Sequence, residues 1–266
     1  MLHFRKKTAY FSYSYGINSK PDSIQNVWNF TLEFLDKNAK PYRVSAPSIW
    51  NYSFTATGIF EGGPTKMAPA NAVGFAAVNS RNFLLPGDSI KGLTFLSKGL
   101  PGIVRSWTQG YVPLPPSVPD VNPALTAKCP DQGYSPQMNV ILKVPGPDIL
   151  PQKLTPLQLL TRLINLKEQA YKLGWITNAG VANSLDAKLK EAEKKLKEGQ
   201  TQVAINLLKS FILDLEAQHL GQTGQGQGAN TGNAQISGKH VTDNAYYLLK
   251  PNAEFILYKL GVTSFP

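Results

Sequence analysis

The spacing of apolar residues changes once along this chain, and that change constrains the fold more than any other feature. Up to about residue 145 apolar and polar residues alternate, whereas beyond residue 155 apolar residues recur every three or four positions. A period of two is typical of half-buried strands, and a period near 3.6 is typical of amphipathic helices. Pro145, Pro147 and Pro151 lie at the change, and proline fits poorly inside either element. The sequence therefore predicts a β domain at 8–145, a proline-rich linker at 146–154 and a helical domain at 155–262.

The first part is predicted to be an antiparallel β-sandwich of immunoglobulin-like type. In the run WNFTLEF the residues Trp28, Phe30, Leu32 and Phe34 fall on one face, which leaves Glu33 and its alternating neighbours on the other. Similar runs occupy 11–17, 50–54, 72–78, 90–96, 102–112 and 138–144. About seven short strands separated by Gly, Pro, Asn and Asp turn signals are typical of such a sandwich.

The second part is predicted to be a four-helix bundle. Its apolar stripes place helices at about 155–173, 179–198, 202–219 and 242–260. Thr155-Pro156-Leu157-Gln158 offers a capping box with proline at the first helical position. Gly174 and Gly199 are suited to end the first two helices, Thr201 is expected to cap the third, and Thr242 is expected to start the fourth.

Three stretches of the helical part resemble a known family. They are WITNAGVANSLDAKLKEA at 175–192, GQTQVAINLLKSFI at 199–212 and GKHVTDNAYYLL at 238–249. Their spacing is similar to the FIMAH domain, a helical module of secreted and surface bacterial proteins. The polar insert before Gly238 and the proline at Pro251 depart from that pattern. The family supplies no catalytic residues, so the resemblance implies an accessory role in attachment or recognition.

The β part loosely resembles sandwich modules of secreted bacterial proteins, at Tyr13–Tyr15 and at 84–104. Both resemblances imply an exported bacterial protein located outside the cell or on its surface. The basic cluster Arg5–Lys7 has no apolar h-region after it, so no signal peptide is readable and a leader is expected to be missing from this sequence. No run of about 18 apolar residues predicts a transmembrane segment.

The positive charge of the chain is spread rather than gathered. The formal net charge is +10, with 14 Lys and Arg against 8 Asp and Glu up to residue 150 and 13 against 9 after it. Nucleic-acid binders usually concentrate their charge in one stripe, so we expect no specific nucleic-acid partner. Weak attraction to anionic cell-surface polymers is compatible with this surface.

The usual catalytic patterns are missing from the sequence. The three histidines, His3, His219 and His240, lie in separate segments, Cys129 is the lone cysteine, and neither H-E-x-x-H nor G-x-S-x-G occurs. We therefore assign no catalytic residue. Loop carboxylates could serve a hydrolase or bind Ca²⁺, the one cofactor considered, although no spacing identifies metal ligands. The acidic residues of the β part are Asp22, Glu33, Asp36, Glu61, Asp88, Asp120 and Asp131. Glu33 is expected to face solvent.

Aromatic residues give the remaining indication of function. The candidate ligand-binding residues are Trp28, Trp50, Tyr52, Trp107 and Tyr111, all on or near predicted strands. Exposed rings in a row can stack on sugar faces, whereas buried rings would fill the core of the sandwich. The sequence leaves both interpretations open.

The leading hypothesis is a non-catalytic exported protein that binds a cell-surface or environmental polymer, most plausibly polysaccharide. The alternative is a hydrolase of glycan, ester or lactone substrates that uses loop carboxylates, with or without Ca²⁺. A third hypothesis is a structural subunit that self-associates through the edge strands of its sandwich.

Overall fold

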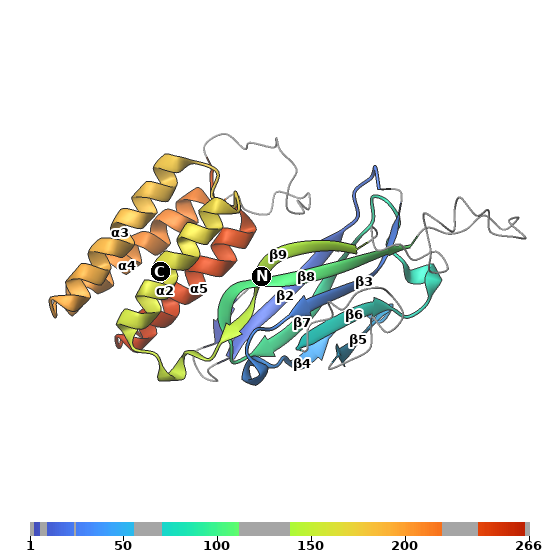
Figure 1. Cartoon of the computed structure of the whole chain (residues 1–266), viewed down its shortest axis with the longest axis horizontal. Helices are drawn as coiled ribbons and strands as arrows, with labels where there is room; N and C mark the ends of the chain where they lie inside the picture. Colours follow the sequence, from blue (N-terminus) through green and yellow to red (C-terminus); the bar gives the residue numbers. More distant parts are fainter. Residues whose placement is uncertain are drawn as a thin grey trace, which may run out of the picture.

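The computed structural model describes residues 3–5, 10–23, 25–55, 71–111, 139–219 and 239–263, with the backbone alone at 3–5, 55, 111 and 139–141. Within these ranges nine strands precede four α-helices (Figure 1). The strands are β1 (His3–Arg5), β2 (Tyr10–Asn18), β3 (Asn26–Glu33), β4 (Tyr42–Ser45), β5 (Trp50–Thr55), β6 (Ala72–Ala77), β7 (Ser89–Ser97), β8 (Leu100–Tyr111) and β9 (Asn139–Ile149). The helices are α2 (Pro156–Lys172), α3 (Ala179–Lys197), α4 (Thr201–Gln218) and α5 (Asp243–Lys259), and short 3₁₀ turns are η1 (Lys37–Ala39), η2 (Ser80–Asn82) and η4 (Pro151–Lys153).

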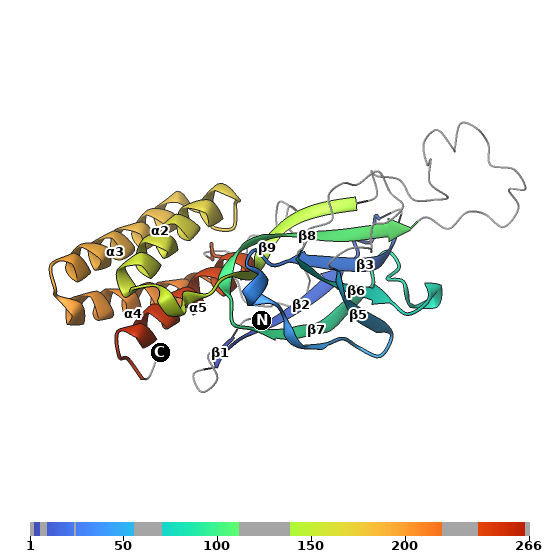
Figure 2. The same ribbon diagram turned by 60° about the horizontal axis from the view of Figure 1, so that its bottom comes forward.

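The strands form two antiparallel sheets, and the predicted succession of antiparallel strands and four helices is confirmed. One sheet has the order β1-β2-β7-β4 and the other β5-β6-β3-β8-β9. The sequence did not predict β1 and β4, which have three and four residues and are too short to show an alternating pattern. In Figure 2 the helices lie at one end of the molecule and the strands at the other.

Two tyrosines of β2 connect the sheets. The Tyr15 ring lies 5.7 Å from the Phe30 ring of β3, and its hydroxyl donates to the Pro145 carbonyl of β9 at 2.8 Å. The Tyr13 hydroxyl donates to the Gly99 carbonyl, also at 2.8 Å. Burial raises the pKa of both hydroxyl groups well above 10.0, so both remain protonated donors at neutral pH. These bonds satisfy polar atoms inside the apolar core that the two sheets share.

Glu33 does not face solvent, so that prediction is wrong. It is 8% exposed, and its carboxylate accepts hydrogen bonds from Nε and Nη2 of Arg105 at 3.0 and 2.8 Å. Asn29 and Thr31, on the same face of β3, are fully buried. β3 lies inside its sheet between β6 and β8, and the side chain of Arg105 on β8 covers Glu33 on the face of β3 that was expected to be solvent-exposed. Alternation identified the two faces correctly but could not show that both are covered.

The predicted linker at 146–154 begins too early, because β9 continues through its prolines to Ile149. Prolines are tolerated on an edge strand where the missing N–H would point away from the sheet. The Pro145 carbonyl accepts from Tyr15, and the Pro147 carbonyl accepts from Leu35 N at 3.2 Å. Neither donor belongs to β8, so the carbonyl groups of both prolines point away from β8. Only residues 150–155, which include η4, remain between the last strand and the first helix.

The helix boundaries follow the predicted capping residues with one exception. Thr155 and Gln158 form the capping box at the start of α2, and Thr242 caps α5 by accepting from Ala245 N. Gly174 and Gly199 follow α2 and α3 with φ of +72° and +75°, a region that glycine adopts without strain. Thr201 is the first residue of α4 rather than its cap, because Gln200 occupies the cap position and makes no side-chain capping bond.

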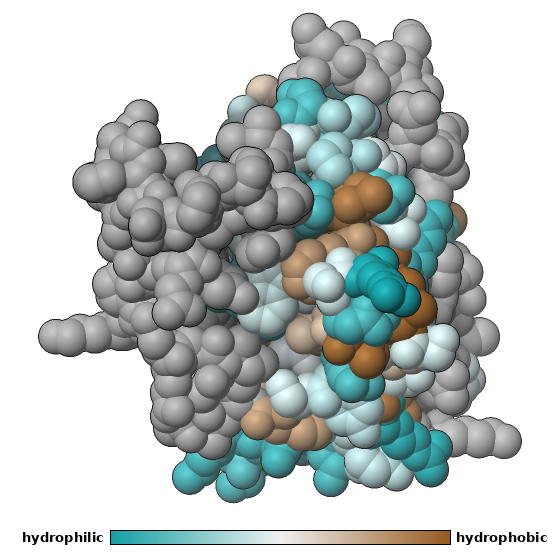
Figure 3. All heavy atoms as spheres, turned by 90° about the vertical axis from the view of Figure 1, so that its right-hand side faces the viewer, coloured by the Kyte–Doolittle hydropathy of each residue, from teal (hydrophilic) through white to brown (hydrophobic). Residues whose placement is uncertain are grey.

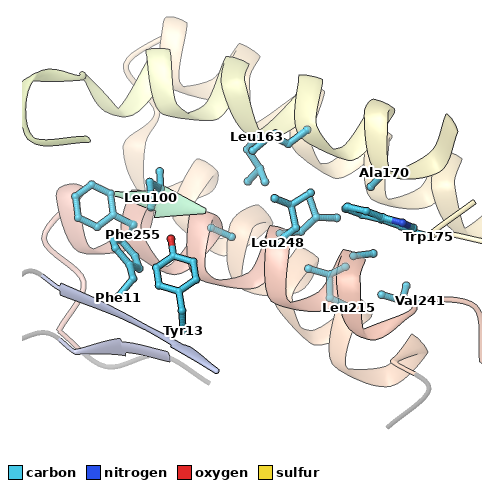
Figure 4. Close-up of a cluster of buried hydrophobic side chains, with 14 of the residues drawn as sticks. Phe11, Tyr13, Leu100, Leu163, Ala170, Trp175, Leu215, Val241, Leu248 and Phe255 are labelled. Atoms are coloured by element: carbon cyan, nitrogen blue, oxygen red, sulfur yellow. The ribbon is translucent and has the colours of Figure 1, made fainter. Parts of the chain in front are cut away.

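The helices pack side by side, and their core continues into the sheets. α2 contacts α3 and α5, α3 contacts α4, and α4 contacts α5. The buried apolar cluster extends from Trp175 and Leu215 among the helices to Phe11 and Tyr13 on β2 (Figure 4). The ring of Phe255 on α5 lies 5.9 Å from the Phe11 ring, with Leu100 of β8 beside them (Figure 4). α5 therefore belongs to the packing of both parts of the chain.

A polar network bridges the same contact between helices and sheet. Arg162 of α2 pairs with Asp148 of β9 at 2.5 Å, donates to the Pro101 carbonyl of β8 at 3.0 Å and donates to Asn252 Oδ1 of α5 at 2.6 Å. Asn252 in turn donates to the carbonyls of Pro101 and Leu248 at 2.9 and 2.7 Å. One guanidinium thus binds groups from two strands and one neighbouring helix.

Replacing Arg162 with alanine is expected to lower the free energy of unfolding by about 3 kcal/mol, because the Asp148 carboxylate and Asn252 Oδ1 lose a partner in a mostly buried site. Urea denaturation followed by circular dichroism measures this change. The control is Lys172→Ala, which removes an exposed pair with Glu168 and should change stability by less than about 0.5 kcal/mol. Equal, small effects of both variants would show that Arg162 does not hold the helices against the sheet.

Asp186 of α3 makes stability depend on pH. Partial burial raises its pKa, but hydrogen bonds from Lys167 and Lys190 outweigh burial and hold the pKa below its ordinary value of 3.8. Both lysine ammonium groups lie 2.6 Å from the carboxylate. A depressed folded-state pKa stabilises the fold above the unfolded pKa, and this stabilisation is lost as pH falls through the folded value.

The urea concentration at the midpoint of unfolding should therefore decrease as the pH is lowered from about 5 to about 3. Asp186→Asn should make this decrease smaller. Asp22→Asn, at an exposed turn, is the control and should leave the pH profile unchanged. A profile of Asp186→Asn identical to that of the original protein would contradict the assignment.

Candidate functional site

The five predicted aromatic residues do not form one exposed row. Trp50 and Trp107 are 2% and 4% exposed, and the Trp50 indole donates to the Asn82 carbonyl at 3.2 Å. Trp28 is half-buried, with its ring 6.5 Å from the Phe83 ring, and the side chain of Tyr111 lies outside the described residues. Tyr52 is 48% exposed. Of the five, Tyr52 alone is seen to offer a large part of its ring to solvent.

Tyr52 has an aromatic neighbour that the sequence analysis did not single out. Phe54, two residues along β5, is 40% exposed, and the two rings meet edge to face at 6.2 Å. β5 is an edge strand of its sheet, and its register pairs Tyr52 with Phe75 and Phe54 with Val73 of β6. Trp50, Tyr52 and Phe54 lie on the same face of β5, and this face is buried at Trp50 but exposed at Tyr52 and Phe54. Lys40 Nζ lies 4.6 Å from the centre of the Phe54 ring, within the range of a cation–π contact.

A second aromatic pair, with one exposed ring, lies on the other sheet. The rings of Tyr10 on β2 and Tyr42 on β4 stack with centres 5.6 Å apart, and Tyr42 is 46% exposed. Two cations accompany them, with Lys98 Nζ 5.6 Å from the Tyr10 ring and the Arg43 guanidinium carbon 5.2 Å from the Tyr42 ring. Both aromatic pairs therefore carry a cation at a ring.

Residues 40–43 contact both pairs. Lys40 contacts Phe54 on one side, and Tyr42 contacts Tyr10 on the other. β4 and β5 both lie toward the lower edge of the strands in Figure 1. We call this the aromatic–basic surface, formed by Tyr10, Lys40, Tyr42, Arg43, Tyr52, Phe54 and Lys98. Sequence reasoning missed Tyr42 and Arg43 because β4 is too short to be recognised as a strand.

Three of the described cations that form no ion pair lie on the aromatic–basic surface. Within the described ranges, Lys40, Arg43 and Lys98 form no ion pair with a carboxylate. Arg105 pairs with Glu33, Arg162 pairs with Asp148, and Lys188, Lys190, Lys195 and Lys197 of α3 pair with nearby carboxylates, whereas several other described lysines are unpaired as well. Three unneutralised cations beside exposed rings make this surface attractive to an anionic or hydroxyl-rich ligand.

Arg43 has an unusual backbone. Its φ of +50° makes it the one residue other than glycine with positive φ in the described part of the chain. The pairing of β4 with β7 is irregular between Tyr42 and Ser45, where Arg43 lies. Such a conformation costs on the order of 1–2 kcal/mol for a residue with a side chain. Arg43 is one of the residues that line a shallow depression of about 240 Å³, together with Ser12, Thr94, Phe95 and Leu96.

The end of the sheets farthest from the helices has a different character. Figure 3 shows apolar residues there around a hydrophilic group. Val78 and Leu85 flank η2 at this end and are exposed, as is Ile49, whose carbonyl accepts from Val78 N at 3.0 Å. Because these side chains are aliphatic, they offer no flat ring to a sugar face, and we leave this end outside the site.

Three of the acidic residues considered for catalysis have local roles, whereas Asp22 is exposed in a turn. Asp36 accepts from Asn38 N at 2.8 Å, and Asp88 accepts from Leu85 N at 3.0 Å, while Glu33 pairs with Arg105. Glu61, Asp120, Asp131 and Cys129 lie outside the described residues. Among the residues that are described, no group of three His, Cys, Asp or Glu side chains could hold a metal ion. None of the described helices is long and apolar enough to cross a bilayer.

One histidine has a close partner that sequence separation concealed. His219 Nε2 lies 2.7 Å from Asp243 Oδ1, and its ring stacks on Tyr246 at 3.9 Å. These residues join the end of α4 to the start of α5, although 24 positions separate His219 from Asp243. His240 lies nearby in sequence and contacts Thr177 before α3. Both contacts fasten helix ends to each other.

Comparisons with known proteins add little to this geometry. No family model matches the sequence, and no curated protein matches it, so the resemblance to the FIMAH domain stays a prediction. A crystal structure of an uncharacterized protein from Nocardia farcinica, described as an immunoglobulin-like fold, aligns with 43% of this chain and 81% of its own. The identity is 13% and the TM-score 0.26, values too low for the likeness to carry an argument about this site.

Proposed function

We propose that the protein binds a polysaccharide, on a cell surface or in the environment, without transforming it. The observation that carries this proposal is the aromatic–basic surface, where two aromatic pairs, with Tyr42, Tyr52 and Phe54 exposed, lie beside three cations that have no carboxylate partner among the described residues. Aromatic rings bind the apolar faces of sugars, and cations attract hydroxyl or acidic groups around the ring. Binding is favoured over hydrolysis because Glu33, Asp36 and Asp88 are each engaged locally.

The finer architecture and the location of the protein belong to the same proposal. The two connected antiparallel sheets support an immunoglobulin-like sandwich, and the contacts among α2, α3, α4 and α5 support a four-helix bundle of FIMAH type. Placement outside the cell or on its surface follows from the resemblance of both parts to modules of exported proteins. The bundle would then act as an attachment or spacing element that presents the sheets to the polymer.

Tyr52→Ala and Tyr42→Ala should each weaken retention on an immobilised polysaccharide about fivefold, because each removes an exposed ring that contributes about 1 kcal/mol. Affinity electrophoresis against cellulose derivatives, xylan, chitosan and polygalacturonate measures retention. Thermal unfolding should be nearly unchanged, because exposed rings contribute little to stability.

Two controls sharpen this test. Tyr171→Ala removes an exposed tyrosine from α2 and should leave retention unchanged. Trp50→Ala removes a buried ring and should instead lower the free energy of unfolding by about 3–5 kcal/mol. If no polysaccharide retains the original protein, or if the Tyr42 and Tyr52 variants behave as Tyr171→Ala does, the proposed function is wrong.

A further inference from the structure

The side chain of Arg43 is held by Tyr42, while its two terminal nitrogens make no hydrogen bond to a described residue. Its Nε donates to the Tyr42 hydroxyl at 2.9 Å, and its guanidinium lies against the Tyr42 ring. None of the described residues accepts a hydrogen bond from its two terminal nitrogens. Arg105 and Arg162, in contrast, direct their terminal nitrogens to Glu33 and Asp148. Arg43 thus presents an oriented donor fork that has no partner among the described residues.

The depression beside this fork is small, and both polar and apolar residues line it. Ser12 of β2 and Thr94 of β7 line it together with Arg43, as do the apolar residues Phe95 and Leu96. Its volume of about 240 Å³ lies below the range of about 300–1,000 Å³ that is usual for small-molecule sites. A site this shallow suits one unit of a longer polymer whose neighbouring units continue across the adjacent tyrosines.

We infer that this depression binds a carboxylate-bearing sugar unit, so that the polymer recognised by the aromatic–basic surface is a polyuronate. This inference rests on the proposed function. A planar carboxylate accepts two parallel, charge-assisted hydrogen bonds from a guanidinium fork, whereas the hydroxyl groups of a neutral sugar lack the negative charge that strengthens them. Lys98 and Lys40, which have no carboxylate partner in the described part of the chain, attract further acidic units along the chain of the polymer.

The test compares two polymers that share a backbone. Full-length protein is titrated with polygalacturonate and with the same polymer after complete methyl esterification, which removes the negative charge and keeps the sugar ring. Binding to the esterified polymer should be at least about tenfold weaker. Binding to polygalacturonate should also weaken at about 0.5 M salt, because exposed charges are screened.

Variants at Arg43 separate the fork from the charge. Arg43→Gly removes the side chain and accepts the positive φ, so it should fold normally and bind polygalacturonate at least about tenfold more weakly. Arg43→Lys keeps the charge but lacks the fork and should lose most of the same affinity. Arg81→Gln removes an exposed arginine from η2 and should bind as the original protein does.

The outcomes distinguish this inference from the proposed function. Equal binding of the charged and esterified polymers would overturn the inference and leave polysaccharide binding intact. Equal losses in Arg43→Gly and Arg81→Gln, or equally tight binding to polyglutamate, would also overturn it, because net charge alone would then explain the affinity. Failure to bind any polysaccharide would remove both the inference and the proposed function.

Discussion

The contact between α5 and the strands β8 and β9 is the constraint on which the arrangement of this molecule depends. Phe255 of α5 extends the apolar core of the helices to Phe11 on β2 of the four-stranded sheet. Arg162 and Asn252 donate hydrogen bonds to the Pro101 carbonyl on β8. Apolar burial supplies the attraction, but it has no preferred direction. The hydrogen bonds of one guanidinium to fixed backbone and carboxylate oxygens supply the direction.

The aromatic–basic surface lies where this packing stops. Trp50 is covered because it occupies the end of β5 that enters the core, whereas Tyr52 and Phe54 continue along an outer strand. The same holds on the other sheet, where β4 is the outer strand and carries Tyr42 and Arg43. Outer strands combine a rigid backbone with side chains that remain accessible, which is a suitable support for recognising an extended polymer.

Helices were predicted more accurately than the faces of strands, for a physical reason. The capping box formed by Thr155 and Gln158 is a local interaction, so the residues that define the start of α2 lie only three positions apart in the sequence. Whether Trp107 or Tyr52 is buried depends on which strands lie beside them, and their alternating pattern is the same in both cases. The positive φ of Arg43 and the pairing of His219 with Asp243 had no sequence signal, because each depends on contacts between distant segments.

The prolines of β9 have a consequence for how the molecule meets its own copies. An open sheet edge recruits foreign strands through its free N–H and C=O groups. Pro145 and Pro147 lack the donors, and their carbonyls already accept from Tyr15 and Leu35. Residues 145–147 therefore offer no template for an added strand, which protects this border of the five-stranded sheet from the intermolecular zippering that begins amyloid-like growth.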